Sequence, residues 1–180
     1  MLPLDYLLPC TTAIRQLADN YNSAVVLCTA TQPNFQSILN LTEKRNKLQL
    51  TDICKSAQNL TDDFRRVNFK YEDKLEDDEI ALELKQCKQV LCIVNKKAHA
   101  QKIYSMIGES DENFHLSTYM YPAHRQKVLK KIKQRLDENK PCRVVSTSLI
   151  EAGVDIDFPT VYRAISGIDS ILQAGGRCNR

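Results

Sequence analysis

The stretch Val90-Leu91-Cys92-Ile93-Val94 is apolar at every position. A strand with one solvated face alternates apolar and polar residues, whereas a parallel strand covered by helices on both faces is apolar throughout. This stretch therefore predicts a central strand of a parallel sheet. Residues 143–147 (Arg-Val-Val-Ser-Thr) predict a second strand that ends in polar side chains.

Segments with a helical pattern of apolar residues precede and follow this stretch, and they alternate with the predicted strands. Apolar residues recur at helical spacing within 80–87 and 100–107, and a further helix is expected from Pro122, because proline is tolerated at the first helical position. We expect the remaining strands at 67–71, 115–120 and 160–165 and a last helix from Ser170. Alternating strands and helices with short connections predict an α/β fold with a parallel sheet flanked by helices.

The N-terminal third of the chain carries only one helix and one strand of the same kind. Thr11 or Thr12 is expected to cap the helix, and residues 24–28 (Ala-Val-Val-Leu-Cys) predict the strand. These two elements are too few for a sheet of their own. We therefore expect residues 1–62 to be the remainder of a preceding α/β domain and residues 63–180 to form a second domain.

Length and composition set outer limits on function. The 180 residues are 43% hydrophobic and 26% charged, which excludes collagen, coiled coil and full disorder. No apolar run reaches the roughly 20 residues of a membrane span, and the N-terminus lacks the pattern of a signal peptide. The seven cysteines include no C-x-x-C pair, so we expect no metal site, and reduced thiols predict a cytoplasmic protein. A net charge of +3 is too small to indicate nucleic acid by itself.

Polar clusters follow three of the predicted buried elements, where ligands of parallel sheets bind. They are Thr29-Ala30-Thr31, residues 146–155, and residues 173–180 (Gln-Ala-Gly-Gly-Arg-Cys-Asn-Arg). On a continuous helix, Gln173, Arg177 and Arg180 would share a face. Two guanidinium groups and an amide suit a polyphosphate, and the alternative is an exposed helix face that pairs with acids.

In this order, the three clusters resemble motifs III, V and VI of superfamily 2 helicases. Three longer sequence segments are similar in particular to the helicase–nuclease of type I CRISPR systems. They are residues 27–33, 115–125 and 151–159. The resemblance extends over nearly the whole chain. It implies RecA-like domains, with residues 63–180 as the second of them and residues 1–62 as a remnant of the first.

The resemblance also implies roles in nucleotide binding. Arg177 and Arg180 would reach the γ-phosphate of ATP, held with Mg²⁺ mainly on the missing part of the first domain, as arginine fingers do in phosphoryl transfer. Gln173 would help to place them. Gly153 and Asp155 would line the nucleotide on this side, and Gly153 would allow a close backbone approach.

Further positions are implied to bind nucleic acid or to couple the domains. Thr147 and Ser148 would face the DNA backbone, since hydroxyl groups contact phosphates without distinguishing bases. Asn95 and Lys96 match motif IV and would touch DNA. Arg125 is the strongest DNA candidate of the basic helix after Pro122, and a solvated face is the alternative there. Thr29 and Thr31 would couple ATP hydrolysis to domain closure.

The sequence departs from the helicase pattern at several points. Neither a P-loop, G-x-x-x-x-G-K-[ST], nor D-E-x-[HQ] occurs in it, and the histidine–aspartate nuclease domain is absent. We therefore expect an internal piece, from just past motif II to motif VI, that is inactive alone although its parent is an ATP-dependent helicase. Gly175 stands where the family usually has alanine, at a helix cost of about 1 kcal/mol.

The resemblance implies a parent that unwinds DNA in CRISPR antiviral defence for degradation by its upstream nuclease domain. Its expected partners are single-stranded DNA, the CRISPR surveillance complex, and the missing N-terminal helicase and nuclease domains, with no membrane partner. One alternative is a non-enzymatic truncated module that binds single-stranded DNA. Another is a superfamily 2 helicase of a different DNA or RNA pathway.

Overall fold

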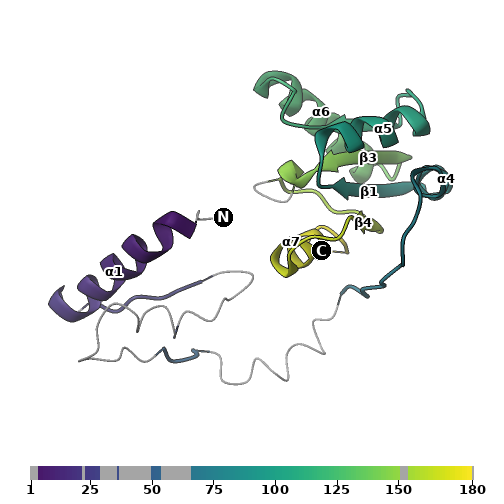
Figure 1. Ribbon diagram of the computed structural model, residues 1–180. Helices are drawn as coiled ribbons and strands as arrows, with labels where there is room; N and C mark the ends of the chain where they lie inside the picture. Colours follow the sequence, from purple (N-terminus) through teal and green to yellow (C-terminus); the bar gives the residue numbers. More distant parts are fainter. Residues whose placement is uncertain are drawn as a thin grey trace. The chain divides into compact units, whose positions relative to one another are not determined.

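The computed structural model describes residues 4–21, 23–28, 36, 50–53, 66–150 and 154–179 (Figure 1). The chain divides into two units, residues 1–63 and 64–180. Helix α1 (Leu4–Tyr21) belongs to the first unit. The second unit contains, in chain order, α4 (Asp77–Gln86), β1 (Gln89–Val94), α5 (Lys97–Ile107), β2 (Asn113–Leu116), α6 (Pro122–Asp137), β3 (Cys142–Thr147), the short 3₁₀ helix η1 (Ser148–Ile150), β4 (Val161–Arg163) and α7 (Ile168–Gly175).

The four strands form one sheet in the order β2-β3-β1-β4, and every neighbouring pair is parallel. Leu91 is opposite Val144 on one side and Val161 on the other, so β1 is a central strand. The predicted α/β fold with a parallel, helix-flanked sheet is therefore confirmed. The strands expected at 90–94 and 143–147 are β1 and β3.

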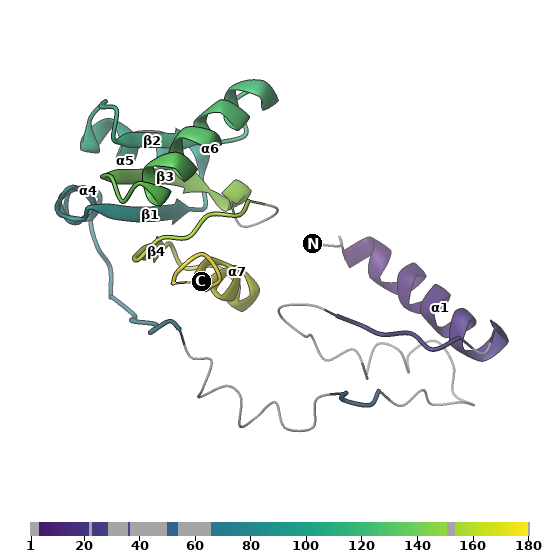
Figure 2. The same ribbon diagram turned by 180° about the vertical axis from the view of Figure 1, so that it is seen from behind.

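Both faces of β1 are covered by helices, which explains why its sequence is apolar at every position. Val90, Cys92 and Val94 face one way and pack in a cluster with residues of α4 and α5. Leu91 and Ile93 face the other way and pack with residues of α6 and α7. Figures 1 and 2, seen from opposite sides, show α5 and α6 on opposite faces of the sheet.

Helix α6 follows the sequence expectation closely. Pro122 occupies its first turn, and the fully buried Ile132 belongs to the core cluster. Val128, Leu129 and Leu136 pack against the same cluster while partly exposed. One stripe of α6 therefore covers the sheet, and the exposed basic residues that lie outside that stripe are Lys127, Lys130, Lys131 and Lys133.

Two of the predicted strands are not formed. Residues 23–28 have no regular secondary structure, and Val25 and Val26 are 39% and 67% exposed. Residues 66–76 are likewise irregular, with Phe69 and Tyr71 exposed. A strand needs a neighbour for its backbone hydrogen bonds, and neither segment pairs with another strand within the described residues. The strand–helix remnant expected before residue 62 is thus represented there by α1 alone.

The threonines expected to cap the first helix lie inside it. Helix α1 begins at Leu4, with Pro9 in its interior. The hydroxyl of Thr11 donates hydrogen bonds to the carbonyls of Leu7 and Leu8, both at 2.9 Å. Serine and threonine inside helices commonly bond back to the preceding turn in this way.

Strand β2 ends earlier than expected. The prediction extended it to residue 120, but pairing with β3 stops at Leu116. Ser117 starts a turn, in which its carbonyl accepts a hydrogen bond from the backbone N–H of Met120 at 3.1 Å. Residues 117–121 therefore form a loop at the carboxyl end of β2.

None of the helices in the described part of the chain has the length and hydropathy that a bilayer crossing requires.

Asp77, in the first turn of α4, connects that helix to α5. Its carboxylate oxygens lie 2.7 Å from Nε2 of His99 and 2.7 Å from Nζ of Lys102. The hydrogen bond from Lys102, and then that from His99, lowers the pKa of Asp77 below its usual value of 3.8. Since the folded-state pKa is depressed, this carboxylate stabilises the fold above its unfolded-state pKa, and the contribution is lost as pH falls through the lower value.

Asp77→Asn is expected to remove this pH dependence. Because Lys102 is largely exposed, we expect the carboxylate to be worth only about 0.5–1 kcal/mol. Urea denaturation at neutral pH and at about pH 3 should show the unaltered chain losing that much more than the variant. Asp78→Asn, next to it on α4, is the control and should lose as much stability between the two pH values as the unaltered chain. Equal losses for all three proteins would contradict the prediction.

Candidate functional site

The parallel sheet brings the carboxyl ends of its strands to one edge. Val94, the last residue of β1, is opposite Thr147, the last residue of β3. Asn95 and Lys96 therefore follow β1 directly beside the point where Ser148 follows β3. Two pairs of residues that the sequence assigned to one ligand thus lie on neighbouring strands of the same edge.

The four side chains of this edge differ in exposure. Lys96 and Ser148 are exposed, whereas Thr147 is only 7% exposed. A ligand at this edge can reach the ammonium group of Lys96 and the hydroxyl of Ser148 directly. Thr147 is too buried to offer more than a small part of its surface.

Asn95 makes hydrogen bonds within the protein. Its Nδ2 donates to the carbonyl of Ile165 at 2.8 Å, and its Oδ1 accepts from Nη1 of Arg163 at 2.6 Å. The same Nη1 also donates to the carbonyl of Ala164 at 2.9 Å. Asn95 thus ties the end of β1 to the end of β4. It shapes this edge of the sheet, which gives it a structural role beside the DNA contact expected from the sequence.

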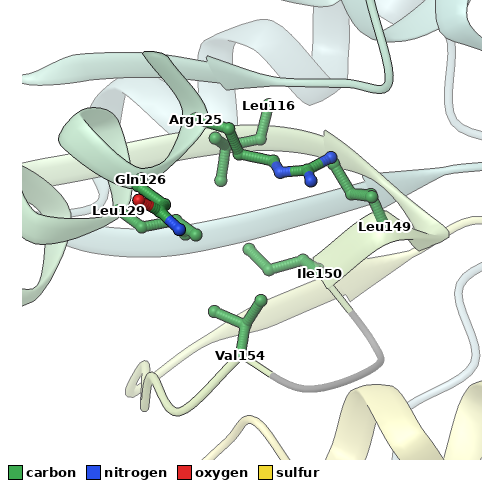
Figure 3. A pocket seen from close by; sticks show the side chains of 7 residues that line it. All are labelled: Leu116, Arg125, Gln126, Leu129, Leu149, Ile150 and Val154. Atoms are coloured by element: carbon green, nitrogen blue, oxygen red, sulfur yellow. The ribbon is translucent and has the colours of Figure 1, made fainter. Parts of the chain in front are cut away.

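Arg125 lies in the first turns of α6 and lines a pocket of about 330 Å³. Figure 3 shows its side chain extending toward Leu149, with Ile150 and Val154 on another wall of the pocket. The pocket thus joins the start of α6 to the segments before and after residues 151–153. The guanidinium group of Arg125 is half-buried near the chain that leaves β3.

The C-terminal residues do not form the continuous helix that the sequence suggested. Helix α7 ends at Gly175, and the backbone N–H of Gly176 donates to the carbonyl of Leu172 at 3.0 Å. Gln173 lies on the helix, but Arg177 lies beyond its end. The expectation that both share one helical face is therefore wrong, and the consecutive glycines, which favour helix ends, are the reason.

A close contact accounts for glycine at position 175. A Cβ placed on Gly175 would lie 2.7 Å from Cζ of the Phe69 ring. Without a side chain there, the ring can lie directly against α7. A larger residue at this position would have to displace the Phe69 ring.

The segment after α7 pairs with residues before β4. The backbone N–H of Phe158 donates to the carbonyl of Arg177 at 2.9 Å, and the N–H of Asn179 donates to the carbonyl of Phe158 at 3.2 Å. These bonds form an isolated parallel bridge between Phe158 and Cys178. Exposed Asp155 and half-buried Arg177 are thus carried on two segments joined by backbone hydrogen bonds.

Four of the predicted site residues lie outside the described residues. They are Thr29, Thr31, Gly153 and Arg180.

Two of the buried cysteines in the described part of the chain are poor nucleophiles. Burial raises the pKa of the Cys92 and Cys142 thiols to about 12, which keeps both protonated at neutral pH. Among the described residues, no three histidine, cysteine or acidic side chains lie close enough together to hold a metal ion.

Sequence reasoning missed an aromatic feature beside this edge. Tyr119 and Tyr121, in the loop after β2, are 74% and 65% exposed. The ammonium group of Lys97 lies 4.4 Å from the centre of the Tyr119 ring. The sequence treated residues up to 120 as a strand, in which alternate side chains would be buried. Two tyrosines in three residues between a strand and a proline-initiated helix were the available indication of a loop.

Comparison with known proteins gives a consistent family. The family model described as "CRISPR-associated nuclease/helicase Cas3, C-terminal" matches residues 86–180. A Haloferax volcanii protein named CRISPR-associated nuclease/helicase Cas3 is 60% identical over 40 residues, which is 22% of this chain and 4% of that protein. A Methanothermobacter thermautotrophicus protein of the same name is 32% identical over 93 residues, 52% of this chain and 11% of that protein. The chain therefore spans only a small part of these relatives.

Solved structures are similar in fold. The crystal structures of T. fusca Cas3 and of T. fusca Cas3-AMPPNP each match with a TM-score of 0.50, at 22% and 20% identity. Each match covers 62% of this chain and 14% of the T. fusca chain. At such identity the likeness concerns the fold, and it agrees with the RecA-like sheet expected from the sequence.

Proposed function

Because the chain belongs to the family of C-terminal domains of the CRISPR-associated nuclease/helicase Cas3, we propose that it forms the second RecA-like domain of an ATP-dependent superfamily 2 DNA helicase of CRISPR antiviral defence. The parent protein unwinds DNA for a nuclease domain that precedes this part of the chain. Its partners are single-stranded DNA and the surveillance complex, and it works in the cytoplasm.

The observation that carries this proposal is that Lys96 and Ser148 follow two neighbouring parallel strands, whose last residues Val94 and Thr147 are opposite each other at one edge of the sheet. Both side chains are exposed, and they follow neighbouring strands in register. An ammonium group and a hydroxyl group contact phosphate oxygens without distinguishing bases. A translocating motor needs contacts of this kind, because it must grip every sequence equally.

The residues near the C-terminus fit a polyphosphate by their chemistry. Gln173 and Arg177 offer amide and guanidinium N–H donors, and arginine presents them in a planar fork that suits phosphate oxygens. Arg177, together with Arg180, neutralises the negative charge that develops during phosphoryl transfer. Asp155 accepts a hydrogen bond from a ribose hydroxyl, and Gly153 lets the backbone approach.

ATP with Mg²⁺ is held mainly by the other RecA-like domain in this proposal. The P-loop lysine and the D-E-x-[HQ] acids that such binding needs do not occur in these 180 residues. Thr29 and Thr31 couple hydrolysis to domain closure. We therefore propose that the 180-residue chain alone does not turn over ATP.

Binding of a fluorescein-labelled oligothymidylate, followed by anisotropy, tests the DNA contact. The unaltered chain is expected to bind, and Lys96→Ala to weaken binding by about 3- to 5-fold, the effect of one lost phosphate contact. Lys88→Ala is the matched control, because Lys88 is also exposed but precedes β1 at the opposite edge of the sheet. No binding, or equal weakening by both substitutions, would contradict the proposed contact. DNA-stimulated phosphate release by the chain alone would contradict the proposed division of the ATP site.

A further inference from the structure

A second hollow lies between α5 and the loop after β2. It is a groove of about 540 Å³. Five of its lining residues are aromatic: Tyr104, His115, Tyr119, Tyr121 and His124. The density of rings suits a flat aromatic ligand, because rings attract one another in offset or tilted arrangements.

The two loop tyrosines present rings that are held in place and still accessible. The Lys97 ammonium group lies 4.4 Å from the centre of the Tyr119 ring, and so occupies one face of that ring. The Tyr121 and His124 rings are tilted against each other with their centres 5.5 Å apart. With 74% and 65% of these tyrosines exposed, a further ring can stack on them without displacing core residues.

The charged groups that line the groove favour a neutral base over a phosphate. No lysine or arginine is among its lining residues, and Glu109 is. Burial lowers the pKa of His115, which keeps that ring neutral at pH 7. A phosphate inside the groove would meet the carboxylate of Glu109, whereas the Lys97 ammonium group lies over the Tyr119 ring on the side of the sheet edge. The polar groups of Gln101, Ser105 and Ser117 suit the hydrogen-bonding edge of a neutral base.

The groove and the phosphate-binding edge are neighbours. Leu116 at the end of β2 is opposite Ser146 of β3, so residues 117–121 leave the sheet at the same edge as Ser148. Lys97, which directly follows Lys96, reaches from that edge to Tyr119. One strand can therefore place its backbone on Lys96 and Ser148 and turn a base toward the tyrosines.

We propose that this groove stacks an unpaired nucleobase of single-stranded DNA on Tyr119 and Tyr121. The inference rests on the proposed function, because it assumes that a strand lies at this edge. It adds that the chain holds bases as well as phosphates. Aromatic stacking tolerates every base, which suits a protein that moves along DNA.

The test compares an oligothymidylate with an abasic strand of the same length, each bound to the full 180-residue chain and followed by anisotropy. The unaltered chain is expected to bind the oligothymidylate about tenfold more tightly than the abasic strand. Tyr119→Ala combined with Tyr121→Ala should reduce the oligothymidylate affinity to the abasic level and leave abasic binding unchanged. Tyr119→Phe, which keeps the ring, should retain the preference.

Tyr71→Ala is the matched control, because Tyr71 is 75% exposed and does not line the groove. Equal affinity of the unaltered chain for both strands, or equal loss on both strands in the double variant, overturns the stacking site and leaves the phosphate contact standing. A chain that binds neither strand overturns the DNA contact itself and the stacking site with it. Circular dichroism of each variant separates loss of binding from loss of fold.

Discussion

Phe158→Ala is expected to lower the free energy of unfolding by about 3–5 kcal/mol. Phe158 is fully buried and is the largest such side chain among the described residues. It lies in the cluster that joins the sheet to α6 and α7. Truncation would remove its apolar contacts and leave a cavity that the surrounding strands cannot fill, so both losses add.

Urea denaturation followed by circular dichroism measures this loss. Phe69→Ala is the matched control, because Phe69 is 61% exposed and its removal should change stability by less than about 1 kcal/mol. Phe158→Leu, which keeps part of the volume, should fall between the two. A loss below about 1 kcal/mol for Phe158→Ala would mean that the core does not depend on this ring.

Affinity for single-stranded DNA is expected to fall about 100-fold between roughly 50 mM and 500 mM salt. Beside Arg163, whose Nη1 donates to Asn95 and to the carbonyl of Ala164, three further cations lie at or near the carboxyl edge: Lys96, Lys97 and Arg125. If each contacts one phosphate, the slope of log affinity against log salt is about −2, because each single-strand contact contributes about −0.7 through counterion release.

Substitutions measure how much each residue contributes to this slope. Lys96→Ala should make it shallower by about 0.7, and the pair Lys96→Ala and Arg125→Ala by about twice as much. Lys88→Ala should leave the slope unchanged. Affinity that does not respond to salt, or a slope left unchanged by the paired substitution, would rule out phosphate contacts at these positions.

The central sheet could be predicted from sequence because its local pattern and its environment agree. Residues 90–94 are apolar throughout, and helices cover both faces of β1. Pro122 marks the start of α6 because the first turn of a helix needs no backbone N–H donor from this position and the φ of proline suits a helix. That Lys96 and Ser148 each follow a strand could also be predicted, whereas the sheet order of the structure is what makes those two strands neighbours.

Secondary structure was predicted wrongly where it depends on residues distant in the sequence or on a turn. Residues 24–28 have the composition of a strand, but no described strand pairs with them. The length of β2 was overestimated because Ser117 turns the chain, and the tyrosines beyond it lie in a loop. The glycines at 175 and 176 were interpreted through the helicase motif, although as a pair they indicate the end of a helix.

The bridge between Phe158 and Cys178 has a mechanical consequence. Its two hydrogen bonds come from the main chain, so no substitution of a side chain removes their donors or acceptors, except one to proline. The two backbone hydrogen bonds consequently hold residues 154–158 next to residues 177–179. If one of these segments moves, the other moves with it. Replacing the Arg177 side chain removes its positive charge from this position and leaves the backbone hydrogen bonds between the two segments intact.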